Sequence, residues 1–140
     1  MRKLERIYHV LNSHYGDLFW WPADTPFEVI VGAVLTQNTA WTNVEKAIRR
    51  FEGKLSPERV LSLPVAELQE IIRPAGYFRQ KAQYLKAVTE WFISYDCNPD
   101  AIKSRPLPDL RAELLQVRGV GNETADSILL YAFDLPAFVV

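Results

Sequence analysis

Two glycines near the end of the sequence could present backbone donors to an anion. Gly119 and Gly121 lie between two segments with helical patterns. Glycine lets the backbone turn sharply where a Cβ would clash, and it leaves the amide N–H groups of the turn uncovered. Unpaired donors and the helix dipole both favour negative charge at the start of a helix. The turn therefore predicts a phosphate site, with a plain glycine turn between packed helices as the alternative.

A polar turn follows the most apolar stretch of the chain. Residues 27–35 are apolar nearly all round, which is typical of a central buried helix. Gln37 and Asn38 come directly after it, where such a helix would reach the surface. These two amides either contact a bound partner or simply cap the end of the helix.

The elements that would position these residues are helices. Apolar residues recur at helical spacing along nearly the whole chain, and no two-residue alternation persists. Ser56 before Pro57 predicts a capped helix start, Pro108 or Asp109 opens the helix before the glycine turn, and Asn122 can cap the one after it. We predict an all-α fold, a helix bundle of about eight to ten helices with short connections.

Composition limits how such a bundle could bind a polyanion. The 140 residues are 49% hydrophobic and 24% charged, enough for one domain or for part of a larger protein. A net charge of −1 excludes nucleic-acid binding by a broad basic surface alone. Cys97 is the only cysteine, which excludes an internal disulfide and a multi-cysteine metal site. No stretch reaches membrane-span length, so we expect a soluble intracellular protein in the cytoplasm.

The run from residue 114 to 133 resembles the helix-hairpin-helix of DNA glycosylases in the endonuclease III superfamily. Three further segments are similar to the 3-methyladenine DNA glycosylase III type: WWP at 20–22, LTQNTAW at 35–41 and RPAGYFRQKA at 73–82. The resemblance covers essentially all 140 residues, but only the N-terminal part of a family member. It implies that residues 1–20 form a helix of the second domain and that 21–140 form the six-helix barrel domain, with the hairpin at 108–133. The remainder of the two-domain fold would be absent, and the faces it covers could drive self-association.

The resemblance also implies site residues. In the superfamily, a glutamine at the place of Gln37 wedges into double-stranded DNA beside the flipped base, and Asn38 lies next to it. The base pocket would be lined by aromatic residues and a proline, namely Trp20, Trp21, Pro22 and Trp41. Such a pocket suits an alkylated purine, because the methylated base is positively charged and an aromatic face attracts a cation. Core packing, the usual place of tryptophan, is the alternative.

The hairpin would hold a DNA phosphate, and its backbone carbonyls would hold a monovalent cation. The expected DNA-binding residues of the hairpin are Arg118, Gly119, Val120, Gly121, Glu123 and Thr124. The expected cation ligands are the carbonyls of Leu115, Val117 and Val120. Lys81 either contacts a phosphate or is solvated.

Two departures from the family pattern bear on the reaction. Bifunctional members carry a Schiff-base lysine where this chain has Glu123, and a carboxylate cannot form an imine. Glu123 either faces the pocket or sits in the first helical turn, where the dipole favours an acid. The aspartate that supports the attacking water would follow Val140, as would any iron–sulfur loop. We therefore expect the 140 residues alone to be inactive.

The resulting prediction is a monofunctional DNA N-glycosylase of base excision repair, associated with the nucleoid, that flips and removes an alkylated purine. Two alternatives remain open. One is a hairpin module that binds DNA without chemistry. The other is a glycosylase for a different lesion, such as an oxidised pyrimidine or a mismatched base.

Overall fold

A computed structural model describes residues 25–135, and this part of the chain consists of helices joined by short turns, with no strand. The predicted all-α fold is thereby confirmed. In chain order the segments are α2 (Pro26–Leu35), α3 (Trp41–Arg49), α4 (Pro57–Ser62), α5 (Val65–Ile72), the 3₁₀ turn η2 (Arg73–Ala75), α6 (Phe78–Ile93), α7 (Pro99–Lys103), α8 (Leu107–Leu115), α9 (Asn122–Ser127) and the π-helical turn η3 (Ile128–Ala132). None of these helices is long and apolar enough to cross a membrane.

Helix α2 forms the centre of the described part. All of its residues except Pro26 and Glu28 are buried, as the apolar stretch predicts. The Thr25 side chain accepts a hydrogen bond from the Glu28 amide (3.2 Å), and Pro26 occupies the first helical turn, so the helix has a defined start. Each buried aliphatic side chain of this helix contributes roughly 1.5–3 kcal/mol by leaving water.

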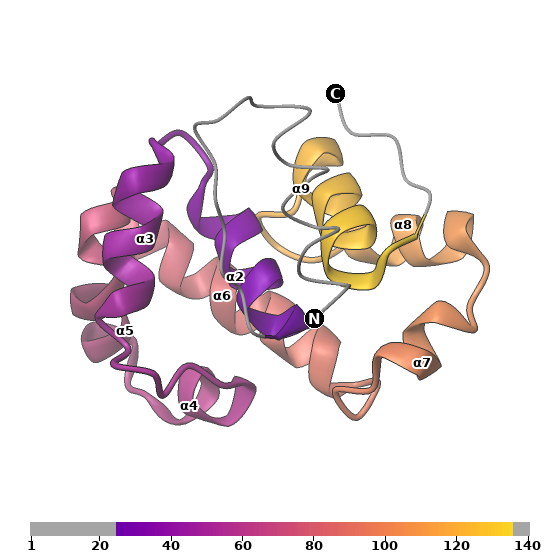
Figure 1. Cartoon of the computed structure of the whole chain (residues 1–140), viewed down its shortest axis with the longest axis horizontal. Helices are drawn as coiled ribbons and strands as arrows, with labels where there is room; N and C mark the ends of the chain where they lie inside the picture. The colour runs from indigo at the N-terminus through magenta and orange to yellow at the C-terminus, as the bar shows by residue number, and fades with distance from the viewer. Residues whose placement is uncertain (1–24, 136–140) are drawn as a thin grey trace.

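Helix α6 crosses α2 and connects the two sides of the molecule. Ala82, Leu85, Val88 and Phe92 form its buried stripe, and the Phe92 ring stacks on Phe27 of α2 at 5.9 Å between ring centres. Figure 1 shows α3, α4 and α5 on one side of this crossing and α7, α8 and α9 on the other. The two ends of α6 therefore lie near different groups of helices.

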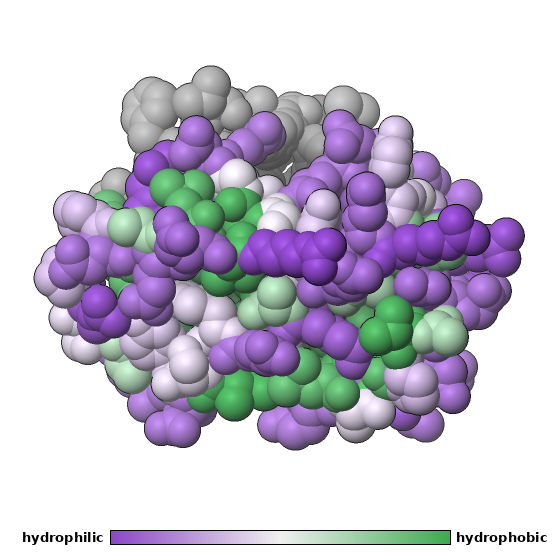
Figure 2. Space-filling model, turned by 180° about the vertical axis from the view of Figure 1, so that it is seen from behind, coloured by the Kyte–Doolittle hydropathy of each residue, from purple (hydrophilic) through white to green (hydrophobic). Residues whose placement is uncertain are grey.

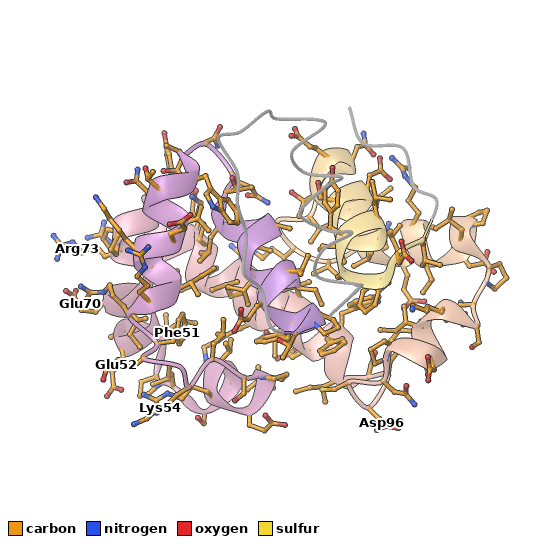
Figure 3. All side chains as sticks on the ribbon, in the orientation of Figure 1. Phe51, Glu52, Lys54, Glu70, Arg73 and Asp96 are labelled. Atoms are coloured by element: carbon orange, nitrogen blue, oxygen red, sulfur yellow. The ribbon has the colours of Figure 1, made fainter. Side chains whose placement is uncertain are left out.

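The face seen in Figure 2 is mainly hydrophilic, with separate hydrophobic areas. Exposed ion pairs contribute to the outer edge. Glu70 and Arg73 project side by side there (Figure 3), 3.5 Å apart at their closest charged atoms. Because both side chains are largely solvated, this pair adds at most about 1 kcal/mol to stability.

Several predicted boundaries differ from the structure. Helix α8 begins at Leu107, one residue before the predicted start. The expected cap by Asn122 is wrong: the N-cap position of α9 is Gly121, and the Asn122 side chain instead accepts a hydrogen bond from Arg111 (3.2 Å). The helix predicted for residues 1–20 lies outside the described residues, so the division into domains stays a prediction.

Candidate functional site

The hairpin between α8 and α9 is built around one glycine that the backbone requires. Gly119 has a φ of +84°, in the left-handed region, and a Cβ at this position would overlap the Tyr84 ring of α6. No other residue type fits both constraints. Gly121 differs, since its φ is −94° and a Cβ there would meet no atom within 4 Å. The idea that both glycines prevent a clash inside the protein is therefore wrong for Gly121, whose bare backbone faces open space.

The second hairpin helix offers unpaired amides at its start. The first intrahelical hydrogen bond of α9 runs from the Ala125 amide to the Gly121 carbonyl (2.9 Å). The amides of the preceding residues have no partner within the helix. The helical run continues from α9 through η3, which adds the dipoles of a second stretch. The phosphate site at these amides stays a prediction.

Gln37 joins the α2–α3 turn to the hairpin. Its amide nitrogen donates to the Gly119 carbonyl (2.9 Å) and to the Thr124 hydroxyl (3.0 Å). Neither acceptor belongs to α2, so the side chain does not simply cap its own helix. Thr124 is buried, with only 7% of its surface exposed, whereas the neighbouring Asn38 is exposed with a φ of +56°. The insertion of Gln37 into DNA stays a prediction.

A cleft of about 420 Å³ lies between the end of α2 and the start of α9. Its lining residues are Ala33, Thr36, Gln37, Asn38, Gly119, Gly121, Asn122, Glu123, Thr124 and Ser127. Glu123 is exposed, lies in the first turn of α9 and borders the cleft, and a role for it in the base pocket stays a prediction. The cleft brings together most of the predicted DNA-binding residues from segments more than 80 positions apart.

The aromatic residues predicted for the base pocket are not part of this cleft as described. Trp41 begins α3 and is buried in the core, with 8% of its surface exposed. Trp20, Trp21 and Pro22 lie outside the described residues. The aromatic pocket therefore stays a prediction, and core packing is the observed environment of Trp41.

The remaining hairpin predictions concern backbone atoms. Arg118 is exposed, and Val120 is buried, so only the backbone of Val120 is available to a ligand. The Val117 carbonyl accepts a hydrogen bond from the Val120 amide (3.1 Å), which leaves it one further lone pair. A monovalent cation on the carbonyls of Leu115, Val117 and Val120 is compatible with this turn and stays a prediction.

Lys81 is where the sequence-based expectation fails. The residue was predicted to contact a phosphate or to be solvated, but only 1% of its surface is exposed. Its ammonium donates to the carbonyls of Leu35 and Ala75, both at 2.9 Å. Burial lowers the pKa of Lys81 to about 8. Because these carbonyls end helical segments, the ammonium satisfies groups that would otherwise be buried without a donor.

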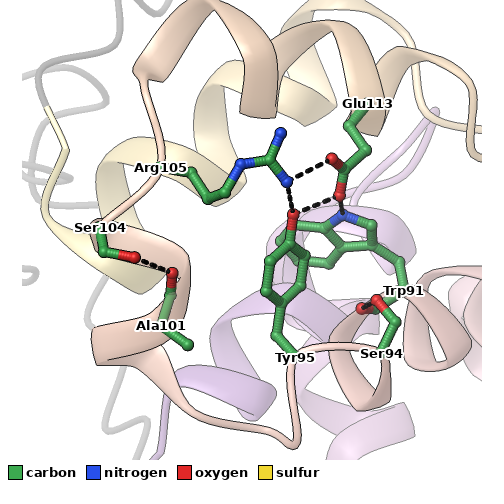
Figure 4. A network of polar contacts seen from close by, with 7 residues as sticks. All are labelled: Trp91, Ser94, Tyr95, Ala101, Ser104, Arg105 and Glu113. Atoms are coloured by element: carbon green, nitrogen blue, oxygen red, sulfur yellow. Dashed lines mark hydrogen bonds and ion pairs between the residues drawn. The ribbon is translucent and has the colours of Figure 1, made fainter.

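Two polar clusters hold the first hairpin helix in place. Arg111 of α8 binds the Asp126 carboxylate of α9 through two nitrogens (2.8 and 3.3 Å). On the other face of α8, the Glu113 carboxylate accepts hydrogen bonds from Trp91 (2.8 Å), Tyr95 (2.6 Å) and Arg105 (3.0 Å), as Figure 4 shows. The orientation of α8 is therefore fixed relative to both α9 and α6.

The Glu113 cluster also shifts ionisation. Burial alone would raise the pKa of Glu113, but the hydrogen bonds from Tyr95 and Trp91 and the charge of Arg105 hold it below its ordinary value. Burial and the neighbouring carboxylate raise the pKa of Tyr95. The carboxylate is thus charged and the phenol neutral at neutral pH.

Tyr77 lies in the RPAGYFRQKA segment that resembles the family, but no role at a functional site was predicted for it. It stands at the start of α6 with a φ of +47° and 62% of its surface exposed. Its ring centre lies 5.7 Å from the Lys81 ammonium, which in turn contacts the end of α2. The available signal was an aromatic residue directly after the turn at Gly76.

Comparisons of the sequence and of the structure with known proteins both lead to proteins of DNA repair. Residues 31–139 match the sequence pattern of a family described as HhH-GPD superfamily base excision DNA repair protein. A candidate DNA repair glycosylase of Methanocaldococcus jannaschii is 48% identical over 139 residues, covering 96% of this chain and 63% of that protein.

Two solved structures are similar over 99% of this chain. One is H. pylori 3-methyladenine DNA glycosylase bound to 1,N6-ethenoadenine, with a TM-score of 0.76, 28% identity and 67% of that chain covered. The other is an endonuclease III–DNA complex, with a TM-score of 0.71, 26% identity and 63% of that chain covered. The present chain thus spans roughly two thirds of the length of these relatives.

Proposed function

Because this chain belongs to the HhH-GPD superfamily of base excision DNA repair proteins, we propose that it binds duplex DNA through the cleft between α2 and α9. The observation that carries the proposal is the contact of Gln37 with the hairpin, which brings two predicted DNA-binding segments together. The solved endonuclease III–DNA complex with the same fold supports DNA as the ligand.

The two sides of the cleft have different tasks in this proposal. The amides at the start of α9 bind a phosphate, and the bare backbone at Gly121 lets the phosphate approach. Gln37 is held by its two hydrogen bonds in the free protein, so its amide is oriented before DNA arrives. On insertion it would exchange these acceptors for base edges exposed by flipping.

The proposed reaction is hydrolysis of the N-glycosidic bond without strand cleavage. Water adds to C1′ of the sugar and loses a proton to the solvent, while the positively charged alkylated base leaves with the bonding electrons as a neutral molecule. Among residues 25–135, Glu123 is the only ionisable residue that borders the cleft, and a carboxylate cannot form the imine of a lyase. The carboxylate that assists water is expected after Val140, so we propose that these 140 residues alone release no base.

The proposed substrate is an alkylated purine. The H. pylori relative, whose name states 3-methyladenine, supports this choice at 28% identity. An aromatic pocket formed by Trp20, Trp21 and Trp41 would attract the positive charge of a methylated base. Methylation also makes the base a better leaving group, so the protein has to stabilise the departing base less.

Binding without chemistry is the second candidate. It is favoured by the cleft lining within residues 25–135, where Glu123 is the single ionisable side chain, because the group expected to assist water is a different carboxylate. The two candidates agree on the DNA-binding surface and differ only in base release.

DNA binding is tested first, by fluorescence anisotropy with an undamaged and an abasic duplex. Gly121→Val should weaken both interactions while the fold persists, since the side chain blocks the phosphate. Gln83→Ala, an exposed change on α6, is the matched control and should bind normally. Unchanged affinity of folded Gly121→Val would show that the hairpin is not the phosphate site.

The reaction type is tested with alkylated duplex and borohydride, using the whole protein. An intact abasic site and no trapped protein–DNA adduct are expected, because an amine is missing at Glu123. A stable adduct would show that another lysine attacks the sugar and would contradict the monofunctional proposal. Release of 3-methyladenine by the 140 residues alone, above a boiled control, would contradict the proposed need for a later carboxylate.

A further inference from the structure

The buried ammonium of Lys81 contacts two surface turns at once. Its nitrogen lies 2.9 Å from the Leu35 carbonyl, the last of α2, and 2.9 Å from the Ala75 carbonyl, the last of η2. Leu35 is two residues before Gln37, and Ala75 is two residues before Tyr77. The ammonium also lies 5.7 Å from the centre of the Tyr77 ring, within range of a cation–π contact.

Both turns have backbone conformations that need support. Asn38 in the first turn has a φ of +56°, and Tyr77 in the second has a φ of +47°. A non-glycine residue in the left-handed region costs about 1–2 kcal/mol, so each turn would relax if its anchor were lost. The Lys81 ammonium binds the Leu35 and Ala75 carbonyls, which lie just before these two turns.

We propose that Lys81 is a positioning residue, whose buried ammonium fixes the α2–α3 turn and the Gly76–Tyr77 turn relative to each other. Gln37 lies in the first turn and reaches the hairpin, so the same anchor sets one wall of the cleft. Lys81 acts through these turns and touches no ligand, because only 1% of its surface is exposed.

The same helix provides a matched control. Lys86 of α6 donates to the carbonyls of Val60, Leu61 and Leu63 (2.9, 3.2 and 2.7 Å), which end helix α4. Like Lys81 it donates to backbone carbonyls at the end of a helix, but none of the residues of α4 lines the cleft. A general loss of stability should follow from either change, whereas loosened turns should follow only from the change at Lys81.

The first test needs no DNA and compares Lys81→Met with Lys86→Met by amide hydrogen exchange. In Lys81→Met, the amides of Thr36, Gln37 and Gly76 should exchange about tenfold faster than in Lys86→Met, the effect of losing one charge-assisted contact. Equal exchange in the two variants would overturn the proposal. If Lys81→Met does not fold, the wild-type protein decides: these three surface amides should be protected together, and unprotected exchange would overturn it.

The second test rests on the proposed function. Affinity for an abasic duplex should fall about tenfold in Lys81→Met at a temperature where both variants are folded, and stay unchanged in Lys86→Met. Equal affinity of the two variants would contradict the role of Lys81 at the cleft. Absence of DNA binding by the wild-type protein would instead contradict the proposed function, and the exchange test would still decide the role of Lys81.

Discussion

Replacing Gln37 tests the contact between the α2–α3 turn and the hairpin most directly. Gln37→Ala removes two hydrogen bonds, at 2.9 Å to the Gly119 carbonyl and at 3.0 Å to the Thr124 hydroxyl. A hydrogen bond in a folded protein contributes about 0.5–1.5 kcal/mol net. Both acceptors border the cleft, where water can partly replace the lost donor. We therefore expect a loss of about 1–2 kcal/mol in the free energy of unfolding.

A second substitution at the same position sharpens this test. Gln37→Glu keeps the shape of the side chain but places a carboxylate against the Gly119 carbonyl. The neighbouring carbonyl raises the pKa of the new carboxyl in the folded state. The variant should therefore be no less stable at acidic pH, where the carboxyl is protonated, and should lose stability as the pH rises through the folded-state pKa. Gln37→Ala should show no such pH dependence relative to the wild type.

Urea unfolding measured between pH 4 and 8 checks both expectations, with exposed Gln83→Ala as the control. For a chain of this length, the loss at Gln37→Ala corresponds to about 3–8 °C in Tm. If Gln37→Ala and Gln83→Ala unfold at the same urea concentration, the contact with the hairpin contributes nothing and the reasoning is refuted.

Three further predictions follow from the hairpin and its supports. Gly119→Ala should lose more than about 2 kcal/mol of stability, since it combines a positive φ with overlap on the Tyr84 ring. Gly121→Ala, at a negative φ with open space, should lose less than about 1 kcal/mol, and equal losses in urea unfolding would contradict this contrast. Because the folded state lowers the pKa of Glu113, the stability of the wild-type protein should fall as the pH drops through that pKa. Glu113→Gln should remove this part of the acid sensitivity. Acid unfolding that is the same in the variant and the wild type would count against a stabilising role of the Glu113 cluster. Burial lowers the pKa of Lys81 to about 8, so the unfolded state binds more protons than the folded state between pH 8 and 10.5. The stability of the wild-type protein should therefore rise over this pH window relative to that of Lys81→Met. If the stability of the two proteins changes with pH in the same way, the lowered pKa of Lys81 is refuted.

Local patterns predicted the helices well where burial and capping act over a few residues. The apolar stretch at 27–35 became the buried centre, and the Ser56 side chain accepts a hydrogen bond from the Arg59 amide (3.1 Å), as its position before Pro57 predicts. These features depend on periodicity and on side chains next to a helix start, both of which are visible in the sequence.

The contacts that build the site were not visible in this way. Gln37 and Gly119 are 82 positions apart, so no spacing rule joins their atoms. Lys81 was misjudged because a lysine is usually solvated, although it lies three residues after Phe78 and four before Leu85, within the apolar stripe of α6. That position was a signal of burial, but the two carbonyls that bind the ammonium come from other segments.

Several lysine and arginine side chains bind backbone carbonyls at helix ends, and this affects how the proposed DNA binding would respond to salt. Lys81 and Lys86 are committed to backbone carbonyls inside the described part of the chain, and Arg50 donates to the carbonyls of Glu70 and Ile71 (2.9 and 2.8 Å) at the end of α5. These side chains already hold carbonyl partners, in a chain whose net charge is −1. In the proposed binding to DNA, these three of the 16 lysine and arginine side chains would displace no counterions. The affinity of the proposed complex should therefore depend less steeply on salt concentration than the number of lysines and arginines alone would suggest.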